Sequence, residues 1–426
     1  MNDKLKRFFS FDNLQVLFCA IILILNSGYY RFTINDSLIP VFLLIAYTIF
    51  IVVYNRKLIN FRTIVCVPAC MLTIGFICSS IANYSINTVL AAGKIFVIMI
   101  CSFIIFLALD CKKISRYLLI IIEIEILLAA ILFLIINVLH IKNLPLVKSR
   151  TGISYYDFFI VTQISTANRA CGCFWEPGVF SSIICFVFLL NLLFNKIKIY
   201  NLLILTVGVA LTFSTAGLII YFILLFGYLL KILKGKMRYA AIGIFSVMFV
   251  VFLVFEQQIV TFLGNEFPTI FGKFLSGDKY AVSFETRYRG PLVNLSIFLD
   301  SPLFGFGFRD SAAKYLQLIS ENVRWHVDSQ TSTSTQIMSS IGIFGVFYSI
   351  PAIAFIFRKN EKSDIFDRII VCVVFLLIVN KEPHINFALT WFVFAILCLF
   401  EKKNNTKQKI TVIDVWFYLG LLCMLM

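Results

Sequence analysis

The chain has 426 residues, of which 60% are hydrophobic and only 14% are charged, with a mean hydropathy of +0.94 and a formal net charge of +15. A soluble protein carries about 25% charged residues, so the composition excludes a soluble globular protein and indicates an integral membrane protein. Most basic residues flank apolar runs, which favours a role in membrane orientation over a nucleic-acid partner.

Apolar stretches long enough to cross a bilayer as helices recur along the chain. Single crossings are predicted at 14–30, 38–54, 63–82, 89–109, 117–140, 175–195, 239–256 and 337–357. Two stretches, 199–230 and 369–400, are longer and have basic residues at both ends, which places both ends in the cytoplasm. We expect each to cross and return as two short helices of about 15 residues, roughly 23 Å long. The turns would be Ser214–Gly217 and Lys381–His384.

This pattern predicts an all-α polytopic membrane protein of about 12 transmembrane helices (about 11 to 13) with one large extracytoplasmic loop. The N-terminus would be cytoplasmic, and Val412–Met426 is an undecided last span. The predicted parts are an N-terminal transmembrane bundle over 1–256, a large extracytoplasmic loop over 257–336 and C-terminal transmembrane helices over 337–426. A second, shorter outer loop covers about 141–174.

The stretch "ANRACGCFWEPGVF" (Ala167–Phe180) places charge at the mouth of an apolar run. Glu176 precedes Pro177 and is therefore biased away from helical geometry, whereas Pro177 suits a first helical turn. We expect a helix to start at Pro177, with its dipole favouring an ionised Glu176. That carboxylate could accept a proton or bind a cation; the alternative is a plain helix start with an interfacial charge. Arg169 lies seven residues earlier.

The large loop contains "FETRYRG", in which Arg287 and Arg289 are two residues apart. Such a pair cannot share a helix face but points the same way in an extended segment. The planar fork of arginine suits phosphate. We therefore predict an extended phosphate-binding segment here; the alternative is a solvated basic loop near lipid head groups.

His326 and Asp328 lie just before the span that follows the loop. A lone histidine is usually structural, but this one has a carboxylate beside it and arginines in the same loop. The sequence has no metal-spaced cluster, no nucleotide-binding motif and no acyl-transfer motif. We expect no cofactor and no metal.

Residues 150–350 resemble the bacterial O-antigen and capsule polysaccharide polymerases (the Wzy type), whose relatives include the O-antigen ligases. The likeness is carried by "RACGCFWEPGVF", by "TFSTAG" between two short spans, and by a large outer loop that runs "SPLFGFGF" towards a histidine and "SIGIFGV". The ligases often have asparagine after the loop histidine, where this chain has Val327, and Ser-Arg where it has Ser214 and Thr215. These departures favour polymerase over ligase.

The resemblance implies a membrane glycosyltransferase that polymerises undecaprenyl-diphosphate-linked oligosaccharide repeat units at the outer face of the cytoplasmic membrane. The acceptor hydroxyl would attack the anomeric carbon of the donor, and the lipid diphosphate would leave. Arg169, Arg287 and Arg289 are the candidate diphosphate ligands. Glu176, Asp328 and His326 are the candidate catalytic bases, with Glu176 preferred.

Two other functions stay open at this point. One is an O-antigen ligase, and the other is a flippase or transporter of lipid-linked oligosaccharides, although a transporter favours short loops and inverted halves. Expected partners are the lipid-linked glycan donor and acceptor, membrane lipid, a chain-length regulator and a flippase, with no nucleic acid. The expected location is the inner membrane.

Overall fold

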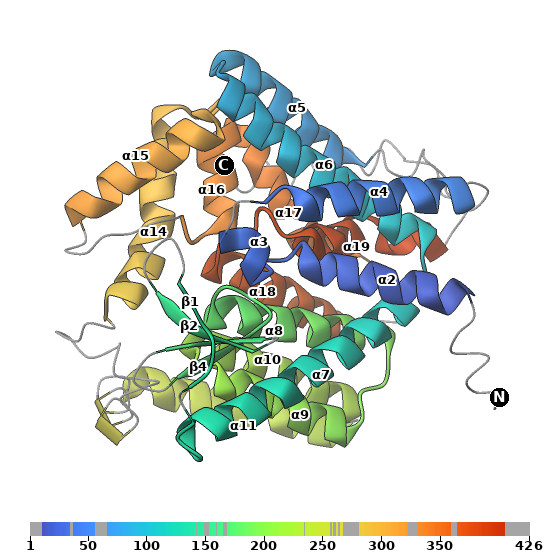
Figure 1. The fold of residues 1–426 in the computed structure, drawn as a ribbon, viewed down its shortest axis with the longest axis vertical. Coiled ribbons are helices and arrows are strands. Elements are labelled where there is room, and N and C mark those ends of the chain that lie inside the picture. The colour runs from blue at the N-terminus through green and yellow to red at the C-terminus, as the bar shows by residue number, and fades with distance from the viewer. Residues whose placement is uncertain are drawn as a thin grey trace.

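A computed structural model describes residues 11–34, 37–55, 66–141, 143–148, 153–158, 160–164, 168–233, 235–255, 281–322, 330–358 and 364–404, with a few residues between 258 and 266. Most of these residues are helical (Figure 1). The predicted last span, Val412–Met426, lies outside the described residues.

The helices follow the apolar runs of the sequence, and most end where basic or turn residues interrupt a run. In chain order they are α2 (Phe11–Leu25), α3 (Tyr30–Ile34), α4 (Ile39–Tyr54), α5 (Val67–Ala82), α6 (Ile86–Ala108), α7 (Cys111–Asn137), α8 (Pro177–Phe194), α9 (Ile199–Leu211), α10 (Thr215–Ile232), α11 (Lys236–Val254), α14 (Ala281–Asp300), α15 (Gly307–Asn322), α16 (Thr333–Ile341), the 3₁₀ helix η3 (Gly342–Tyr348), α17 (Ile350–Phe357), α18 (Ile365–Lys381) and α19 (Ala388–Asn404).

Five helical segments in the described part of the chain are long and apolar enough to cross a membrane. They are Ile86–Ala108, Cys111–Asn137, Pro177–Phe194, Thr215–Ile232 and the continuous run Thr333–Phe357. Many side chains on the outer helices are apolar and exposed, among them Phe42, Val53 and Leu203. The mostly helical fold is therefore compatible with a membrane protein.

The two long apolar stretches are each divided into two helices. Between α9 and α10 the chain turns at residues 212–214, where Ser214 caps α10 by accepting a hydrogen bond from the amide of Gly217 (3.3 Å). Between α18 and α19 the chain leaves the helix over residues 382–387. We call this second segment the 382–387 break.

The all-α prediction is wrong for residues 146–172, which form a small antiparallel sheet. Its strands pair in the order β1 (Leu146–Lys148), β2 (Ser154–Phe158), β3 (Ile160–Gln163) and β4 (Arg169–Gly172). These stretches are too short and too polar for a crossing, and their β-branched and aromatic side chains suit strands. The sheet buries Tyr155, Val161 and Cys171 in a small core of its own.

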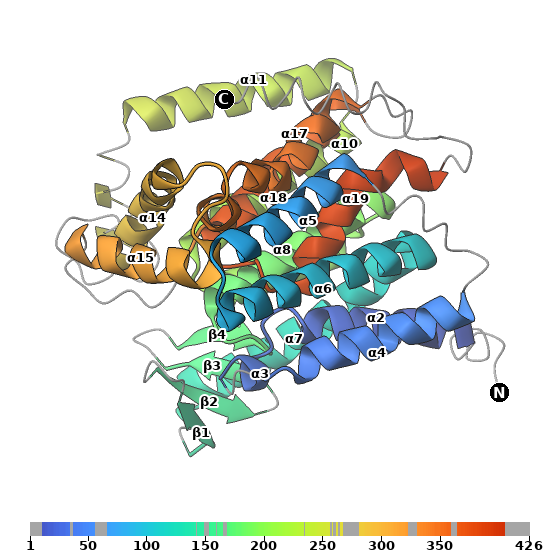
Figure 2. The same ribbon diagram turned by 90° about the horizontal axis from the view of Figure 1, so that it is seen from above.

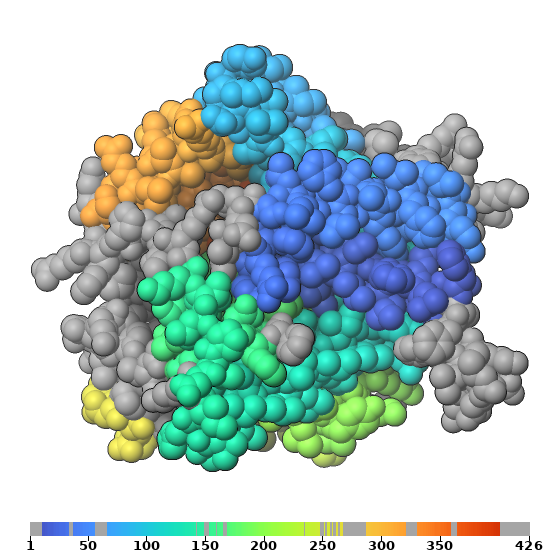
Figure 3. Space-filling view, in the orientation of Figure 1, coloured from blue at the N-terminus to red at the C-terminus, as the bar shows by residue number. Residues whose placement is uncertain are grey.

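Helix α3 fastens the N-terminal helices to this sheet. The amide of Tyr30 donates to the carbonyl of Cys173 (3.0 Å), and the Tyr30 hydroxyl donates to Asp157 (2.5 Å). Figure 3 shows the two segments side by side on one face, blue against green. The described residues between α7 and α8 thus include a sheet that packs against the N-terminal helices.

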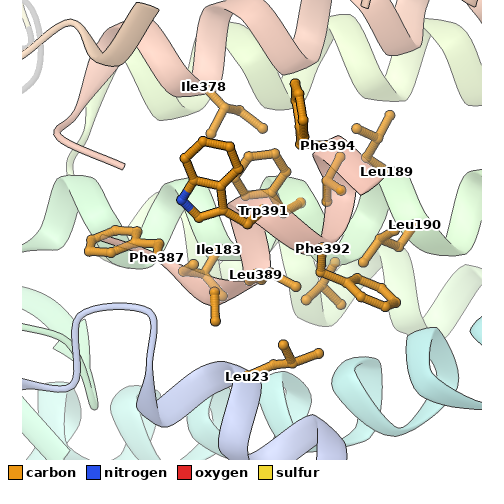
Figure 4. Packing of buried hydrophobic residues seen from close by; sticks show 14 of the residues in the cluster. Leu23, Ile183, Leu189, Leu190, Ile378, Phe387, Leu389, Trp391, Phe392 and Phe394 are labelled. Atoms are coloured by element: carbon orange, nitrogen blue, oxygen red, sulfur yellow. The ribbon is translucent and has the colours of Figure 1, made fainter. Parts of the chain in front are cut away.

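Helix α8 is the centre of the fold. Every residue from Pro177 to Leu192 is buried, so α8 has no face left for lipid or water. Figure 4 shows its side chains Ile183, Leu189 and Leu190 in one cluster with Trp391 of α19 and Leu23 of α2. One hydrophobic core therefore joins helices from both sides of the 257–336 segment.

The bundle has two chemically different ends. In both Figure 1 and Figure 2 the sheet, α14 and α15 lie at the left end, whereas α2 and α4 extend towards the right. The end of α8 away from the sheet is rich in basic residues: Lys231 donates to the carbonyl of Leu192, and Asn195 donates to that of Lys112 (3.2 Å). The N-terminal end of α8 meets the sheet and α14.

Close backbone contact fixes the loop between α14 and α15 to the α16–η3 junction. Gly342 has φ +68°, and a Cβ there would collide with the backbone of Leu303. Gly342→Ala should therefore lower the thermal unfolding midpoint, because a backbone conformation that is nearly restricted to glycine costs about 1–3 kcal/mol in another residue. The midpoint can be followed in detergent with a dye that reacts with the buried cysteines as they become exposed.

Gly243→Ala is the matched control. Gly243 lies in α11, and a Cβ there has no neighbour within 4 Å. This variant should unfold at the wild-type temperature or slightly above it, because alanine favours a helix. A Gly342→Ala protein as stable as Gly243→Ala would contradict the expected collision.

Candidate functional site

The N-terminus of α8 lies where the sheet, α14 and the 382–387 break converge. Glu176 is the residue just before the helix, in an extended conformation (φ −147°, ψ 142°), and Pro177 occupies the first turn. The predicted helix start is therefore confirmed. The Glu176 side chain makes no capping hydrogen bond, so its carboxylate is directed to other partners.

Arg287 brings two carboxylates together at this point. Its Nη2 nitrogen lies 2.6 Å from Oε1 of Glu382 and 3.7 Å from Oε1 of Glu176, and its Nε donates to the carbonyl of Lys381 (3.1 Å). The three side chains differ in exposure: Glu382 is 2% exposed, Arg287 26% and Glu176 28%. We call Glu176, Arg287, Lys381 and Glu382 the charge cluster.

The expected extended segment at Arg287 and Arg289 is wrong, because both residues lie in helix α14. Residues two apart on a helix are turned by about 200° from one another. Arg287 shares its face with Gly290 and Asn294, and Asn294 is buried and donates to Thr335 of α16 (3.1 Å). Packing against α16 therefore aims Arg287 at the cluster and turns Arg289 towards another side.

Gly178 makes room for Glu382. A Cβ at position 178 would collide with the carboxylate of Glu382, and it would lie 3.6 Å from Oε1 of Glu176. Both carboxylates therefore lie against the first turn of α8. The positive end of a helix dipole favours negative charge there.

Lys381 ties the 382–387 break to the same turn of α8. Its ammonium donates to the carbonyl of Gly178 (2.9 Å) and to the hydroxyls of Ser181 (2.5 Å) and Ser182 (3.3 Å). The lysine is buried, with 5% of its surface exposed. A buried ammonium needs several acceptors and nearby negative charge, and this arrangement supplies both.

Serine and threonine side chains at the start of α16 hold the break in place. Thr333 donates its hydroxyl to the carbonyl of Glu382 (3.2 Å) and accepts from the amide of His384 (2.7 Å). Ser332 donates to Asn380 (2.7 Å). His384 is fully buried between Phe186 and Phe387, so this histidine is part of the packing.

Arg169 lies on β4 and supports the turn between α9 and α10. Its Nε donates to the carbonyl of Thr212 (3.0 Å) and its Nη2 to that of Phe213 (3.4 Å). Phe213 has a positive φ of 46°, a conformation that costs energy in a non-glycine residue. Arg169 therefore stabilises a strained turn beside the charge cluster.

The helix dipole favours an ionised Glu176, but burial and a neighbouring charge act in the opposite direction. Burial, reinforced by the neighbouring carboxylate of Glu382, raises the pKa of Glu176 to about 7, although Arg287, Arg169 and Lys381 act in the opposite direction. Loss of hydration thus outweighs the favourable charges. A carboxyl group with a pKa near neutrality can take up and release a proton under physiological conditions.

The structure brings together Glu176, Arg287 and, close by, Arg169. His326 and Asp328 lie outside the described residues. Among the described residues no group of three or more His, Cys, Asp and Glu side chains could hold a metal ion.

Sequence reasoning missed Lys381 and Glu382 as site residues and treated them only as turn residues. Their signal was present, since charged residues inside a long apolar stretch are candidates for function. Their pairing with α8 and α14 could not be foreseen, because about 200 residues separate Lys381 from Ser181 along the chain.

Arg169→Lys tests the support of the turn. A lysine keeps the charge but cannot bond both carbonyls with one planar fork, so a buried carbonyl loses its donor at a cost of about 1–3 kcal/mol. We expect a lower thermal midpoint in the cysteine-dye assay.

Arg31→Lys is the control, because Arg31 is 58% exposed and pairs with Asp157 at the surface (3.3 Å). It should leave the midpoint unchanged. Equal midpoints for the two variants would show that Arg169 does not hold the turn.

No protein-family model matches the chain, and no curated protein matches it either. The charge cluster has to be interpreted by its own geometry.

Proposed function

We propose that this protein is a membrane glycosyltransferase that polymerises lipid-diphosphate-linked oligosaccharide repeat units into O-antigen or capsular polysaccharide. The observation that carries the proposal is the position of Arg287 between Glu176 and Glu382. The reaction requires a cation for the departing diphosphate and a base for the attacking hydroxyl, and the cluster offers both at one point.

Arg287 is the residue we assign to the diphosphate. About a quarter of its side chain is exposed, and a guanidinium binds phosphate through two parallel hydrogen bonds. Negative charge grows on the diphosphate as the sugar–oxygen bond breaks, so a fixed cation stabilises the transition state more than the ground state. Arg169 remains a predicted ligand of the same diphosphate, whereas Arg289 lies on another side of α14.

Glu176 is the residue we assign to the base. The acceptor hydroxyl gives its proton to the carboxylate while its oxygen bonds to the anomeric carbon, and the electron pair of the broken bond leaves with the diphosphate. The raised pKa suits this task, because a base is most effective when its pKa is near the working pH. Asp328 and His326 remain alternative predictions for the base.

The distribution of basic residues supports an orientation with the cluster outside. Lys112, Lys231, Arg238 and Arg358 all lie at helix ends opposite to the N-terminus of α8, where Arg238 pairs with Asp364 and Arg358 donates to the carbonyl of Leu397 (2.5 Å). By the positive-inside rule that end is cytoplasmic. We therefore propose a cytoplasmic N-terminus in the inner membrane, with the cluster facing outwards.

Cysteine labelling of intact cells tests the orientation. Ser320→Cys in α15 and Lys196→Cys between α8 and α9 both place a thiol at an exposed position, at opposite ends of the bundle. A membrane-impermeant maleimide should label position 320 in intact cells and position 196 only after the membrane is opened. The reverse pattern would show the opposite orientation, with the charge cluster on the cytoplasmic side, and would contradict the proposal.

Glu176→Gln tests the function in a strain that lacks the gene. Deletion should leave single repeat units on the lipid carrier or on its final acceptor, and the wild-type gene should restore long chains. Glutamine keeps the shape of Glu176 but accepts no proton, and loss of a general base typically lowers a rate on the order of 100- to 10,000-fold. The polymer ladder should therefore collapse to short chains at equal protein level.

Asp157→Asn is the matched control, since Asp157 is an arginine-paired carboxylate at the same end of the protein but on the sheet. It should give a normal ladder. Long chains from Glu176→Gln would exclude Glu176 as the base, and complete loss of surface glycan in the deletion strain would indicate a ligase.

A further inference from the structure

We propose that Glu382 is a positioning residue, which holds Arg287 away from Glu176 and thereby keeps Glu176 able to accept a proton. The inference rests on the proposed role of Glu176 as the base. A turn between two helices does not by itself require a charged side chain. The inference therefore gives the 382–387 break a role in the reaction in addition to its role in the fold.

The distances show that the guanidinium of Arg287 is closer to Glu382 than to Glu176. The Nη2 nitrogen lies within hydrogen-bond distance of Glu382 (2.6 Å) but 3.7 Å from Glu176, and Nε is bonded to the carbonyl of Lys381 (3.1 Å). Contacts from the last residue of α18 and the first residue of the break therefore hold the guanidinium beside Glu382. Glu176 is left with a long ion pair on the more exposed side.

Glu382 itself is fixed on three sides. Its carboxylate fills the space above Gly178, its carbonyl accepts from Thr333 (3.2 Å), and the preceding Lys381 is anchored to α8 through Ser181 (2.5 Å). The side chain is 2% exposed. A carboxylate held so firmly can act as a fixed charge instead of following Arg287.

Four charged groups influence the ionisation of Glu176. Glu382 lies in the break, Lys381 at the end of α18, Arg287 in α14 and Arg169 in β4. Among the carboxylates named here only Glu382 opposes ionisation of Glu176, while the three cations favour it.

Removing the charge of Glu382 changes this balance in one direction. The repulsion between the two carboxylates disappears, and Arg287 becomes able to close on Glu176. Both changes favour the ionised form of Glu176 and lower its pKa. Glu176 would then be a weaker base, in a tighter ion pair with the arginine that the diphosphate needs.

Infrared titration of the purified, detergent-solubilised protein measures this effect directly. The carbonyl stretch of the protonated Glu176 is identified as the band that disappears in Glu176→Gln. In Glu382→Gln the titration midpoint of this band should fall by about one pH unit or more, whereas Glu382→Asp, which keeps the charge, should stay closer to wild type. Gly178→Ala is a second variant, because its methyl group displaces the Glu382 carboxylate without altering the charge of the chain.

Asp364→Asn serves as the control, because Asp364 caps the other end of α18 and pairs there with Arg238. It should leave the Glu176 band unmoved. The same proteins are assayed for chain extension of a lipid-diphosphate-linked repeat unit across pH. In Glu382→Gln the acid side of the profile should move to lower pH together with the infrared midpoint.

The two readouts separate the inference from the proposed function. The titration is interpreted in Glu382→Gln, in Gly178→Ala or in both, according to which variant remains folded. If the Glu176 band titrates there as in wild type, the positioning role is overturned. A shifted band in a protein whose wild-type form extends no chain at any pH supports the positioning role and overturns the polymerase proposal.

Discussion

The fold depends on the burial of helix α8 on all sides. A helix with no exposed face can meet water or a polar ligand only at its ends, so chemistry in the middle of this bundle has to take place at a terminus. The N-terminal end carries positive partial charge from the aligned peptide dipoles, which favours carboxylates. Glu176 lies there because it directly precedes α8, and Glu382 reaches the same place from the 382–387 break.

The buried carboxylate of Glu382 and the partly buried one of Glu176 require cations, and the origin of those cations links distant parts of the chain. Lys381 comes from the end of α18, just before the break, and Arg287 comes from α14, within the segment that the sequence marks as the large outer loop. A buried charge that loses its partner is strongly destabilising. The charge cluster thus holds α14 against the rest of the bundle. A ligand that moved Arg287 outwards would weaken this contact.

Local sequence patterns predicted the positions of the helices better than the contacts between them. The Glu-Pro-Gly triplet indicated the helix start at Pro177, and basic residues at both ends of long apolar stretches indicated the divisions between α9 and α10 and between α18 and α19. The sheet escaped prediction because its strands have only three to five residues and alternate weakly. The spacing between Arg287 and Arg289 predicted an extended segment, whereas the packing of Asn294 on α16 determines the direction of the Arg287 side chain. Glu382 became visible only through a contact between residues about 200 positions apart.

The short length of α9 has a consequence for any bilayer around this protein. Its 13 residues span only about 20 Å, whereas the hydrocarbon layer is about 30 Å thick. Helices α8 and α10 have 18 residues each and reach about 27 Å, so the charge cluster and the turn at 212–214 lie close to one surface when the basic end of the bundle is level with the other. Helix α9, which descends from the same turn, then begins short of the basic surface. Lys198 precedes its first residue, and a lysine side chain there can extend along the lipid until its ammonium reaches the interface.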